Sequence, residues 1–467
     1  MAAHRRRGDP RSTGGPAPRT THRPRRTDMS SPVWHDDAAP VPEAADPRVT
    51  AAKNAFLAGF PLVATARIMQ GMAQRLGVNT MWASRRLSGP GSRAIVAPNL
   101  DTVYALAVLD LRAGPLTLTL PDIRDRYHSV QLLDAWMGGF GLLGTRTTGG
   151  RGGSWAILPP GHSGPIPDGL EPIPCPTGHA FLLCRIRALD AADAAEAGAL
   201  AARIELRALA GTAGGTTLPP PAGRAHDTGR DGIGFFDELC AALPANPPVT
   251  AEQRRALDAV AALGVAAGRR PGAELDESGR AVLAAAVAAG MRELEPPAIA
   301  PRTVNGWTTN LGLGTQDTRG GLRERATVAR YFWGPVPAEE AIYPRTSTSA
   351  DGLPLDGSKR YRIRFPGGGL PPVDAFWSLT AYGPDMFLVP NESGRYSISG
   401  DDPGLVTGAD GSLDLHLCHE PPAGSESNWL PVPAGRFNLI LRLYLPRRPV
   451  LDGAYAYPPV TVLPPGT

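Results

Sequence analysis

The sequence predicts an α+β protein that is mainly β, with two antiparallel β-sandwich domains joined by a helical segment. Short apolar runs with a period of two fall in both halves of the 467-residue chain, and Ala-rich segments with helical spacing fall between them. The chain holds 55 Gly and 50 Pro, which favour many short strands and turns over a helical bundle. Strands segregated from helices in this order indicate two sheet domains linked by a helical layer.

The first half is expected to contain a tail, a long helix and a sheet domain. Residues 1–48 are basic and Pro-rich, cannot bury enough apolar surface to fold, and are expected to be a disordered tail and linker. The tail has no apolar h-region typical of a secretory signal, so the cytoplasm is the expected location. Residues 49–190 form the predicted N-terminal sandwich domain, with a leading helix at 49–76 in which Pro61 marks a break or a kink. Its strands are predicted at 101–111, 127–136, 154–158 and 180–187.

The second half is expected to contain the helical connection and the second sheet domain. Residues 191–340 form the predicted connecting region, with helices at 190–211, 233–243, 250–267, 275–294 and 322–333. Residues 341–467 form the predicted C-terminal sandwich domain, with strands at 360–365, 375–382, 385–389, 412–418 and 437–445.

Composition argues against several classes of partner. The formal net charge is only +3, and no basic face indicates nucleic-acid binding. No run approaches the ~18 consecutive apolar residues of a membrane span, so no membrane partner is expected. The four cysteines form no CxxC pair and are expected to be free and buried, with a disulfide across a hairpin as the alternative for the first two: Cys175, Cys184, Cys240 and Cys418.

Polar residues interrupt the apolar stretch "PNLDTVYALAVLDL" at 98–111. Asn99 and Asp101 lie at the entrance of the predicted strand, where an Asx side chain often bonds its own backbone and fixes a turn. The alternative is that these two residues and Tyr104 ring the mouth of the sandwich and contact a ligand. The strand is apolar on both faces, which predicts a covering layer on each side.

The stretch "RYHSVQLLDAW" at 126–136 places an acid near an aromatic ring. On the predicted strand, Asp134 and Trp136 share a face and present a carboxylate beside a stacking surface, which suits a sugar or another polar ligand. The alternative is a buried carboxylate satisfied by backbone amides.

The strand "FNLILRLYLP" at 437–446 carries an arginine among apolar residues. Alternation places Arg442 and Tyr444 on the face opposite the leucines. A buried guanidinium without a partner is destabilising, so we expect either a carboxylate of the protein or an anionic ligand to compensate its charge.

Metal, nucleotide and cofactor signals are weak. In "LDLHLCHE" at 413–420, Asp414, His416 and Cys418 share a strand face, but His419 points the other way and no further ligand set is evident, so no metal site is predicted. The Gly-rich stretch 312–321 follows no clear strand, and the sequence specifies no cofactor.

Several motifs resemble a known pair of domains. "VAPNLDTVYALAVLDL" and "DRYHSVQLLDAW" resemble the domain of unknown function 1254. "YRIRFPGGGLPPVDAFWSLTAYGPDMFLVPNESGRYSISGD", "DGSLDLHLCHEPP" and "NWLPVPAGRFNLILRLYLPRRPVLDGAYAYPPV" resemble the domain of unknown function 1214. The resemblance runs from about residue 50 to the C-terminus and implies two jelly-roll-like sandwiches with an intervening helical part, but no reaction. The stretch after "NGW" departs from the family pattern, because it lacks the tyrosine of a Gly, Tyr and acid cluster.

Three functions remain open from the sequence. The first is an enzyme acting on a small polar or partly aromatic metabolite in a cleft between the sandwiches. Asp134 or Asp101 would then act as general acid or base, and Arg442 would neutralise a carboxylate or oxyanion. The second is a non-catalytic carbohydrate- or metabolite-binding protein, and the third is a structural protein with a buried polar network; the sequence does not decide whether the chain forms a homo-oligomer. The remaining predicted ligand-binding residues are Asn99, Tyr104, Trp136, Trp377, Tyr382 and Tyr444.

Overall fold

Two layered β-sheets form the N-terminal sandwich. The computed structural model describes residues 46–93, 96–209, 217–295, 302–312 and 321–464, so the predicted tail lies outside the described residues except for 46–48. Sheet A has the order β1-β2-β8-β4-β5 and sheet B the order β7-β6-β3-β9. Sheet A comprises β1 (Trp82–Ala83), β2 (Thr102–Asp110), β8 (His179–Arg187), β4 (His128–Asp134) and β5 (Gly139–Gly144). Sheet B comprises β7 (Glu171–Pro174), β6 (Gly153–Leu158), β3 (Leu116–Leu120) and β9 (Glu205–Ala208).

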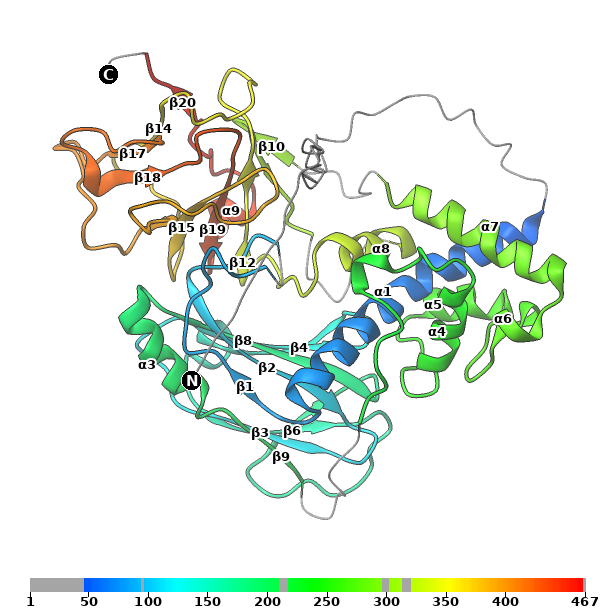
Figure 1. Cartoon of the computed structure of the whole chain (residues 1–467). Coiled ribbons are helices and arrows are strands. Elements are labelled where there is room, and N and C mark those ends of the chain that lie inside the picture. Colours follow the sequence, from blue (N-terminus) through cyan, green and yellow to red (C-terminus); the bar gives the residue numbers. More distant parts are fainter. Residues whose placement is uncertain (1–45, 94–95, 210–216, 296–301, 313–320, 465–467) are drawn as a thin grey trace, which may run out of the picture. The chain divides into compact units, whose positions relative to one another are not determined.

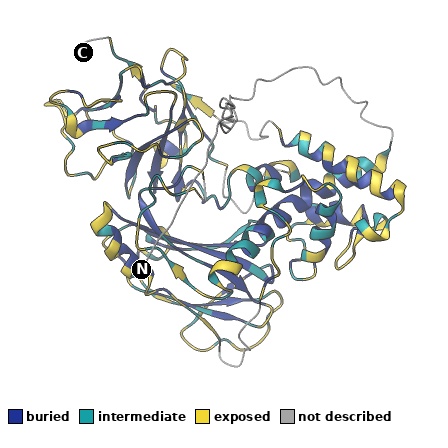
Figure 2. Cartoon of the chain, in the orientation of Figure 1, coloured by how far each residue is buried: buried dark blue, intermediate teal, exposed yellow. Residues whose placement is uncertain are grey.

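Sheet A is covered on both faces, as its apolar composition predicts. Val103 and Ala105 of β2 pack with Leu118 of sheet B and with helix α3 (Ala191–Ala201) in one core cluster. Val108 of β2 and Phe181 of β8 face the other way and join the core of the helical layer. The strands of sheet A are accordingly mostly buried (Figure 2).

Helix α1 (Pro47–Leu76) is the centre of the helical layer and lies among the other helices in Figure 1. It continues through Pro61 without a break, because the surrounding core holds this part of the helix buried. It is long and apolar enough to cross a membrane, but 72% of its most apolar window is buried inside the protein, as in a core helix. The helices around it and the short helical turns are η1 (Ala225–Asp227), α4 (Gly234–Ala242), α5 (Ala251–Asp258), η2 (Ala261–Leu263), α6 (Pro271–Glu274), α7 (Glu277–Glu293) and α8 (Leu322–Tyr331).

A second sandwich follows the helices. Sheet C has the order β10-β11-β13-β19-β15-β16, with β12 also paired to β19, and sheet D has the order β18-β17-β14-β20. Their facing sides form one apolar core. Sheet C comprises β10 (Arg302–Val304), β11 (Trp307–Thr309), β12 (Ala341–Ile342), β13 (Arg345–Thr346), β15 (Trp377–Tyr382), β16 (Ser397–Ser399) and β19 (Asn438–Tyr444). Sheet D comprises β14 (Tyr361–Phe365), β17 (Leu413–Cys418), β18 (Trp429–Pro431) and β20 (Thr461–Val462); the remaining short helices are α2 (Thr145–Thr148), η3 (Glu426–Asn428) and α9 (Arg448–Leu451).

The observed fold confirms the predicted class: several antiparallel sheets in a sandwich-like arrangement, with helices between the two sheet regions. The pairs β6–β7 and β17–β18 are parallel exceptions. The predicted helix 190–211 is wrong beyond α3, because residues 205–208 pair with β3 as an edge strand. The predicted strand 385–389 is also wrong, since this segment forms a turn and a loop. The four cysteines are free and buried, as predicted, whereas the jelly-roll-like connectivity stays a prediction.

One glycine sets the distance between two helices, and its substitution tests the packing. A Cβ on Gly290 of α7 would lie 2.2 Å from the Phe56 ring of α1. Phe56 is fully buried against Phe60 and Phe235, so the ring cannot move aside. We expect Gly290→Ala to lower the free energy of unfolding by up to about 2 kcal/mol, because overpacking costs ~1–3 kcal/mol and the gain in helix propensity offsets ~1 kcal/mol of it.

Urea unfolding would measure this change. Ala284→Ser, at an exposed position of the same helix, serves as the control and should shift the free energy by less than about 0.5 kcal/mol. A more stable Gly290→Ala variant would contradict the packing described for α1 and α7.

Candidate functional site

The outer faces of sheets A and C are polar where the two sandwiches meet. Strand alternation turns Leu441 and Leu443 into the core of the second sandwich and places Arg442 and Tyr444 on the opposite face. On the first sandwich, Tyr104 and Arg185 are direct cross-strand partners on the outer face of sheet A. We refer to the group formed here as the interdomain cluster, which comprises Asn99, Asp101, Tyr104, Arg185, Tyr343, Ser378, Thr380, Tyr382, Arg442 and Tyr444.

The turn that leads into β2 holds the two sheets together. Asn99 Oδ1 accepts the backbone N–H of Asp101 (2.7 Å), which is the predicted Asx turn. The Asn99 amide also donates to the Tyr444 hydroxyl (2.7 Å), so the turn residue reaches sheet C as well. The Ser378 hydroxyl donates to Asp101 Oδ2 (2.6 Å). The structure therefore confirms the Asx turn at Asn99, whereas contact of Asn99 and Asp101 with a ligand stays a prediction.

Arg442 is 3% exposed and makes no ion pair with a described residue. Its Nη1 donates to the Thr380 hydroxyl (2.9 Å) and its Nη2 to the Ala97 carbonyl (3.1 Å). A third bond runs from Nη2 to the Tyr382 hydroxyl (2.6 Å), which in turn donates to the Pro98 carbonyl (2.7 Å). Burial acts to lower the pKa of Arg442, but Tyr382 and Asp101 raise it above its usual value, so the guanidinium stays charged.

Arg185 is the second buried guanidinium of the interdomain cluster. It is 8% exposed and donates to Gln131 Oε1 (3.1 Å) and to the Gly334 carbonyl (3.3 Å). No carboxylate of the described residues lies within ion-pair distance of it. The aromatic groups that act on it electrostatically are Tyr343, Tyr104, Tyr127 and Tyr444.

The other two buried arginines of the described chain have carboxylate partners. Arg187 lies two residues after Arg185 and contacts Asp401 (2.6 Å) and Asp101 (3.7 Å). Arg67 of α1 binds Glu238 of α4 and Asp231. Buried charges are normally paired in this way, so Arg185 and Arg442 are exceptions that occur in the same cluster.

Tyrosines surround the two guanidinium groups. The Tyr343 ring lies 5.8 Å from Arg442 Cζ and its centroid 6.1 Å from that of Tyr444. Burial raises the pKa of Tyr343, and both Arg185 and Arg442 act to lower it. Tyr343 nevertheless keeps 38% of its surface exposed. Tyr343 therefore connects the cluster to solvent.

A carboxylate closes the side of the interface near β4. Glu340 is 1% exposed and accepts from the Tyr127 hydroxyl (2.8 Å) and from Arg146 Nε (2.9 Å). Tyr127 and Phe376 both contact the Tyr444 ring, and Phe376 stacks on it at 4.2 Å. Glu340 thus forms its ion pair with Arg146, and not with the guanidinium groups of Arg185 or Arg442.

Asp134 and Trp136 do not join the interdomain cluster. Strand β4 ends at Asp134, whose Oδ1 accepts the backbone N–H groups of Trp136 and Gly138 (2.8 Å each). Trp136 packs in the helical core and donates to the Pro247 carbonyl (3.0 Å). Asp134 pairs with Ala180 of β8, roughly 23 Å along the strand from Arg187 at about 3.3 Å per residue. The structure therefore does not bring Asp134 together with Arg442. Asp134 is a buried carboxylate that accepts backbone N–H groups, as the alternative prediction describes.

Trp377 is also separate from the cluster. It lies on β15 but faces the core of the second sandwich, where it packs 5.3 Å from Phe365. Its neighbours Ser378 and Thr380 face the cluster instead. The alternation of β15 that brings Tyr382 to the cluster excludes Trp377 from it.

Sequence reasoning missed Arg185, Tyr343, Ser378 and Thr380. The signal for Arg185 was present in "FLLCRIRAL", where two arginines interrupt an apolar strand as Arg442 does. Tyr343 lies between the short strands β12 and β13 of sheet C, and no local pattern indicated that it lies near Arg442.

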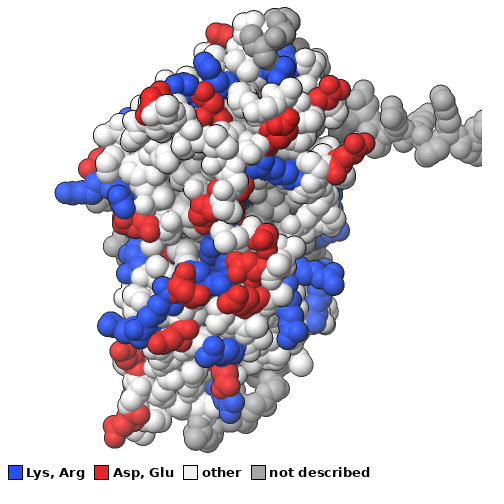
Figure 3. Space-filling model, turned by 90° about the vertical axis from the view of Figure 1, so that its left-hand side faces the viewer, with Lys and Arg blue, Asp and Glu red and all other residues white. Residues whose placement is uncertain are grey.

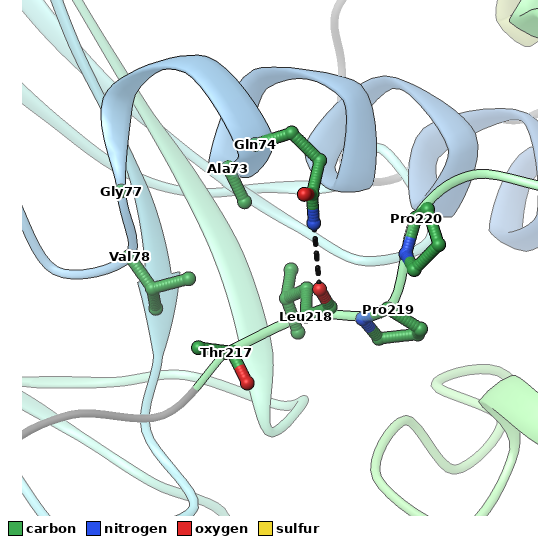
Figure 4. A pocket seen from close by; sticks show the side chains of 8 residues that line it. All are labelled: Ala73, Gln74, Gly77, Val78, Thr217, Leu218, Pro219 and Pro220. Carbon is green, nitrogen blue, oxygen red and sulfur yellow. Dashed lines mark hydrogen bonds between the residues drawn. The ribbon is translucent and has the colours of Figure 1, made fainter.

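Other surface features give no comparable site. An open depression of about 620 Å³ lies at the end of α1 (Figure 4), and no charged side chain lines it. Its only lining polar side chains are Gln74, which donates to the Leu218 carbonyl (2.9 Å), and Thr217. On the face drawn in Figure 3, acidic and basic side chains are intermixed. Within the described ranges no group of three or more His, Cys, Asp or Glu side chains is placed to hold a metal ion.

The environment of Asp134 generates a pH prediction. Burial raises its pKa to about 6, against the opposing effect of the N–H groups of Gly138 and Trp136. Because the folded-state pKa exceeds the unfolded value of about 3.9, the folded state binds the proton more tightly, and stability falls as pH rises from about 4 to about 6. A difference of about two units between the folded and unfolded pKa corresponds to a decrease of up to about 3 kcal/mol in the free energy of unfolding.

Urea unfolding across this pH range, on the wild type and Asp134→Asn, checks the prediction. The variant keeps the Oδ1 acceptor but cannot ionise, so it should lack this decline with rising pH. Parallel pH profiles for the two proteins would show that Asp134 is not responsible.

Comparison with known proteins identifies two domains in the chain. The family model described as a protein of unknown function, DUF1254, matches residues 78–208. A second model with the same description, DUF1214, matches residues 340–448. The first match covers most of the N-terminal sandwich, and the second carries the sheet C strands of the interdomain cluster.

Two solved structures are similar to this chain. The VPA0106 protein from Vibrio parahaemolyticus has a TM-score of 0.70 and 24% identity, with coverage of 89% of this chain and 100% of that chain. This likeness shows a shared fold. A putative uncharacterized protein from Burkholderia cenocepacia has a TM-score of 0.44 and 14% identity, with coverage of 89% of this chain and 94% of that chain. No curated protein matches the chain. The chain therefore combines an N-terminal DUF1254 domain with a C-terminal DUF1214 domain.

Proposed function

We propose that this protein binds a small polar, partly aromatic metabolite at the interdomain cluster. The observation that carries the proposal is the meeting of two polar sheet faces that the chain buries. Ser378, Thr380 and Arg442 lie on the outer face of sheet C, and Tyr104 and Arg185 lie on the outer face of sheet A. Ser378 bonds Asp101 across the interface, and all five except Tyr104 are buried. Ligand sites are typically concave, largely aromatic and equipped with a few convergent polar groups, and they favour domain interfaces.

The aromatic and polar parts of the cluster suit different parts of such a ligand. Tyr104 and Tyr343 are the tyrosines of the cluster that are not buried, and they offer rings against which a planar group can pack. The partly exposed Tyr343 supplies access from solvent. Arg185 and Arg442 supply N–H donors that keep their charge in a buried setting.

An enzyme acting on this metabolite is the second candidate function. The contact that favours it is the hydrogen bond between Ser378 and Asp101 (2.6 Å), which places a hydroxyl beside a carboxylate at the edge of the cluster. Asp101 would act as general base, because a base must lie within hydrogen-bond reach of the proton that it takes. The geometry supports binding more directly, since no described histidine or cysteine adjoins this pair to complete a nucleophilic arrangement.

We further propose a cytoplasmic location and a small molecule as the partner, without a nucleic-acid or membrane partner. The small net charge of +3 and the mixed charges on the face in Figure 3 support the exclusion of nucleic acid. The burial of α1 inside the helical layer supports the exclusion of a membrane role for that helix. A homo-oligomer is compatible with the proposal.

The test is untargeted mass spectrometry of a small-molecule extract from the producing cells, incubated with the purified full chain. We expect the wild type to retain or consume a compound that a folded Arg442→Met variant does not, because Met keeps the length of the side chain but removes its donors. Arg364→Met, on sheet D, is the matched control and should behave as the wild type, since Arg364 is 43% exposed and pairs with Asp414 away from the cluster.

The outcomes separate the candidate functions. Retention without consumption supports a binding protein. Consumption by the wild type but not by a folded Asp101→Asn variant supports an enzyme. If the wild type neither retains nor consumes any compound, the proposal fails and the cluster is a structural network.

A further inference from the structure

The charges at the interdomain cluster do not balance. Arg185, Arg187 and Arg442 contribute three formal positive charges, and the described carboxylates beside them are Asp101 and Asp401. Arg187 pairs directly with Asp401 and lies near Asp101. Two carboxylates thus accompany three guanidinium groups, which leaves one positive charge without a counter-charge. Glu340 does not supply the missing charge, because it pairs with Arg146.

The imbalance is unusual for this protein. Of the four buried arginines in the described ranges, Arg67 and Arg187 have carboxylates within 2.6 Å, whereas Arg185 and Arg442 have only neutral acceptors at hydrogen-bond distance. Desolvating a charge without a counter-ion costs several kcal/mol. Arg442 Cζ lies 5.8 Å from the Tyr343 ring, and Arg185 acts electrostatically on the same tyrosine. Two buried guanidinium groups without a carboxylate partner in one cluster favour the binding of an anion.

We propose that the ligand of the interdomain cluster is a small organic monocarboxylate, bound by the guanidinium groups of Arg185 and Arg442. This inference rests on the function proposed above and adds the chemical class of the ligand. The planar guanidinium fork matches a carboxylate. A single negative charge cancels the one left over, whereas a phosphate ester of charge near −2 would overcompensate it.

The surroundings of the two arginines fit the organic part of such a ligand. Tyr104 and Tyr343 are the members of the cluster with exposed surface, so the body of the ligand would lie against their rings. Leu106 and Leu183 form the next row of the sheet A face, beside Tyr104 and Arg185. The donors come from side chains on strands rather than from a helix N-terminus, which phosphate sites often use.

Thermal unfolding of the full chain with a panel of probes tests this inference. The probes are benzoate and propionate as monocarboxylates, inorganic phosphate and phenyl phosphate as phosphates, and benzamide and glucose as neutral compounds, all at one ionic strength. We expect the carboxylates to raise the Tm in a concentration-dependent way, as a ligand that binds only the folded state does. Phosphates and neutral compounds should raise it less or not at all.

Variants show whether the two arginines carry the effect. In Arg185→Met and Arg442→Met the carboxylate affinity derived from the Tm shifts should fall by about 30-fold or more, as for the loss of a partner from a buried charge pair. Arg67→Met also removes a buried arginine, but one in the helical layer. The Arg67→Met substitution should lower the Tm of the protein without ligand. Carboxylates should still raise the Tm of this variant as they do that of the wild type.

The results distinguish this inference from the proposed function. Stabilisation by phosphates alone, or by neutral compounds with equal effect on the arginine variants, overturns the carboxylate assignment and leaves a ligand site. A carboxylate effect that persists in both Arg185→Met and Arg442→Met also overturns it. If carboxylates do not raise the Tm and the extract yields no retained or consumed compound, both the assignment and the proposed function fail.

Discussion

The central physical constraint on this structure is the burial of two polar sheet faces against each other. Sheets A and C each direct one face into an apolar core, so the remaining faces must be covered by the helical layer or by the other sandwich. Where the sandwiches meet, hydrogen bonds accompany the aromatic packing of Tyr127, Phe376 and Tyr444. These bonds run from Ser378 to Asp101, from Asn99 to Tyr444, and from Tyr382 to the Pro98 carbonyl. Each buried polar group there needs a partner, and an interface that satisfies nearly all of them has a fixed geometry.

This constraint gives the unpaired guanidinium groups their significance. Arg187 shows that the chain places a carboxylate beside a buried arginine at this interface where the structure requires one. Arg185, on the same face of the same strand, receives only an amide oxygen and a backbone carbonyl. Neutral acceptors satisfy the hydrogen-bond donors of a guanidinium but leave its charge uncompensated in a low-dielectric region, which costs free energy. An anionic ligand would compensate this charge and offset the desolvation cost.

Much of the fold follows from periodicity, because the strands that form the cores alternate strictly. The alternation of β19 placed Arg442 and Tyr444 on the face that the structure shows, and the apolar nature of β2 on both faces predicted its two covering layers. The misassigned segment 205–208 is an edge strand, whose partner β3 lies far away in sequence and leaves no local signal. The Asx turn at Asn99 was predictable since its hydrogen bond is local.

The candidate site could be predicted only in part. The sequence shows which apolar strands contain polar residues. It does not show which of these residues lie close together in space, because that depends on how the strands pair and pack. Asp134 and Asp101 both looked like candidate acids, yet the antiparallel register separates them by most of the length of sheet A. Trp377 was included because it is aromatic, although the alternation of its own strand excludes it. The approach of Tyr343 to Arg442 joins segments far apart in sequence, which no spacing rule describes.

The most direct measurement of the central claim is the free energy of unfolding of Arg185→Met and Arg187→Met, by chemical denaturation without added small molecules. Arg187→Met should lose about 2–4 kcal/mol, because it leaves Asp101 and Asp401 without their partner. Arg185→Met should stay within about 1 kcal/mol of the wild type, because it removes a charge that the described protein does not compensate. A loss in Arg185→Met as large as that in Arg187→Met would contradict the account, since it would mean that the protein itself already stabilises the Arg185 guanidinium.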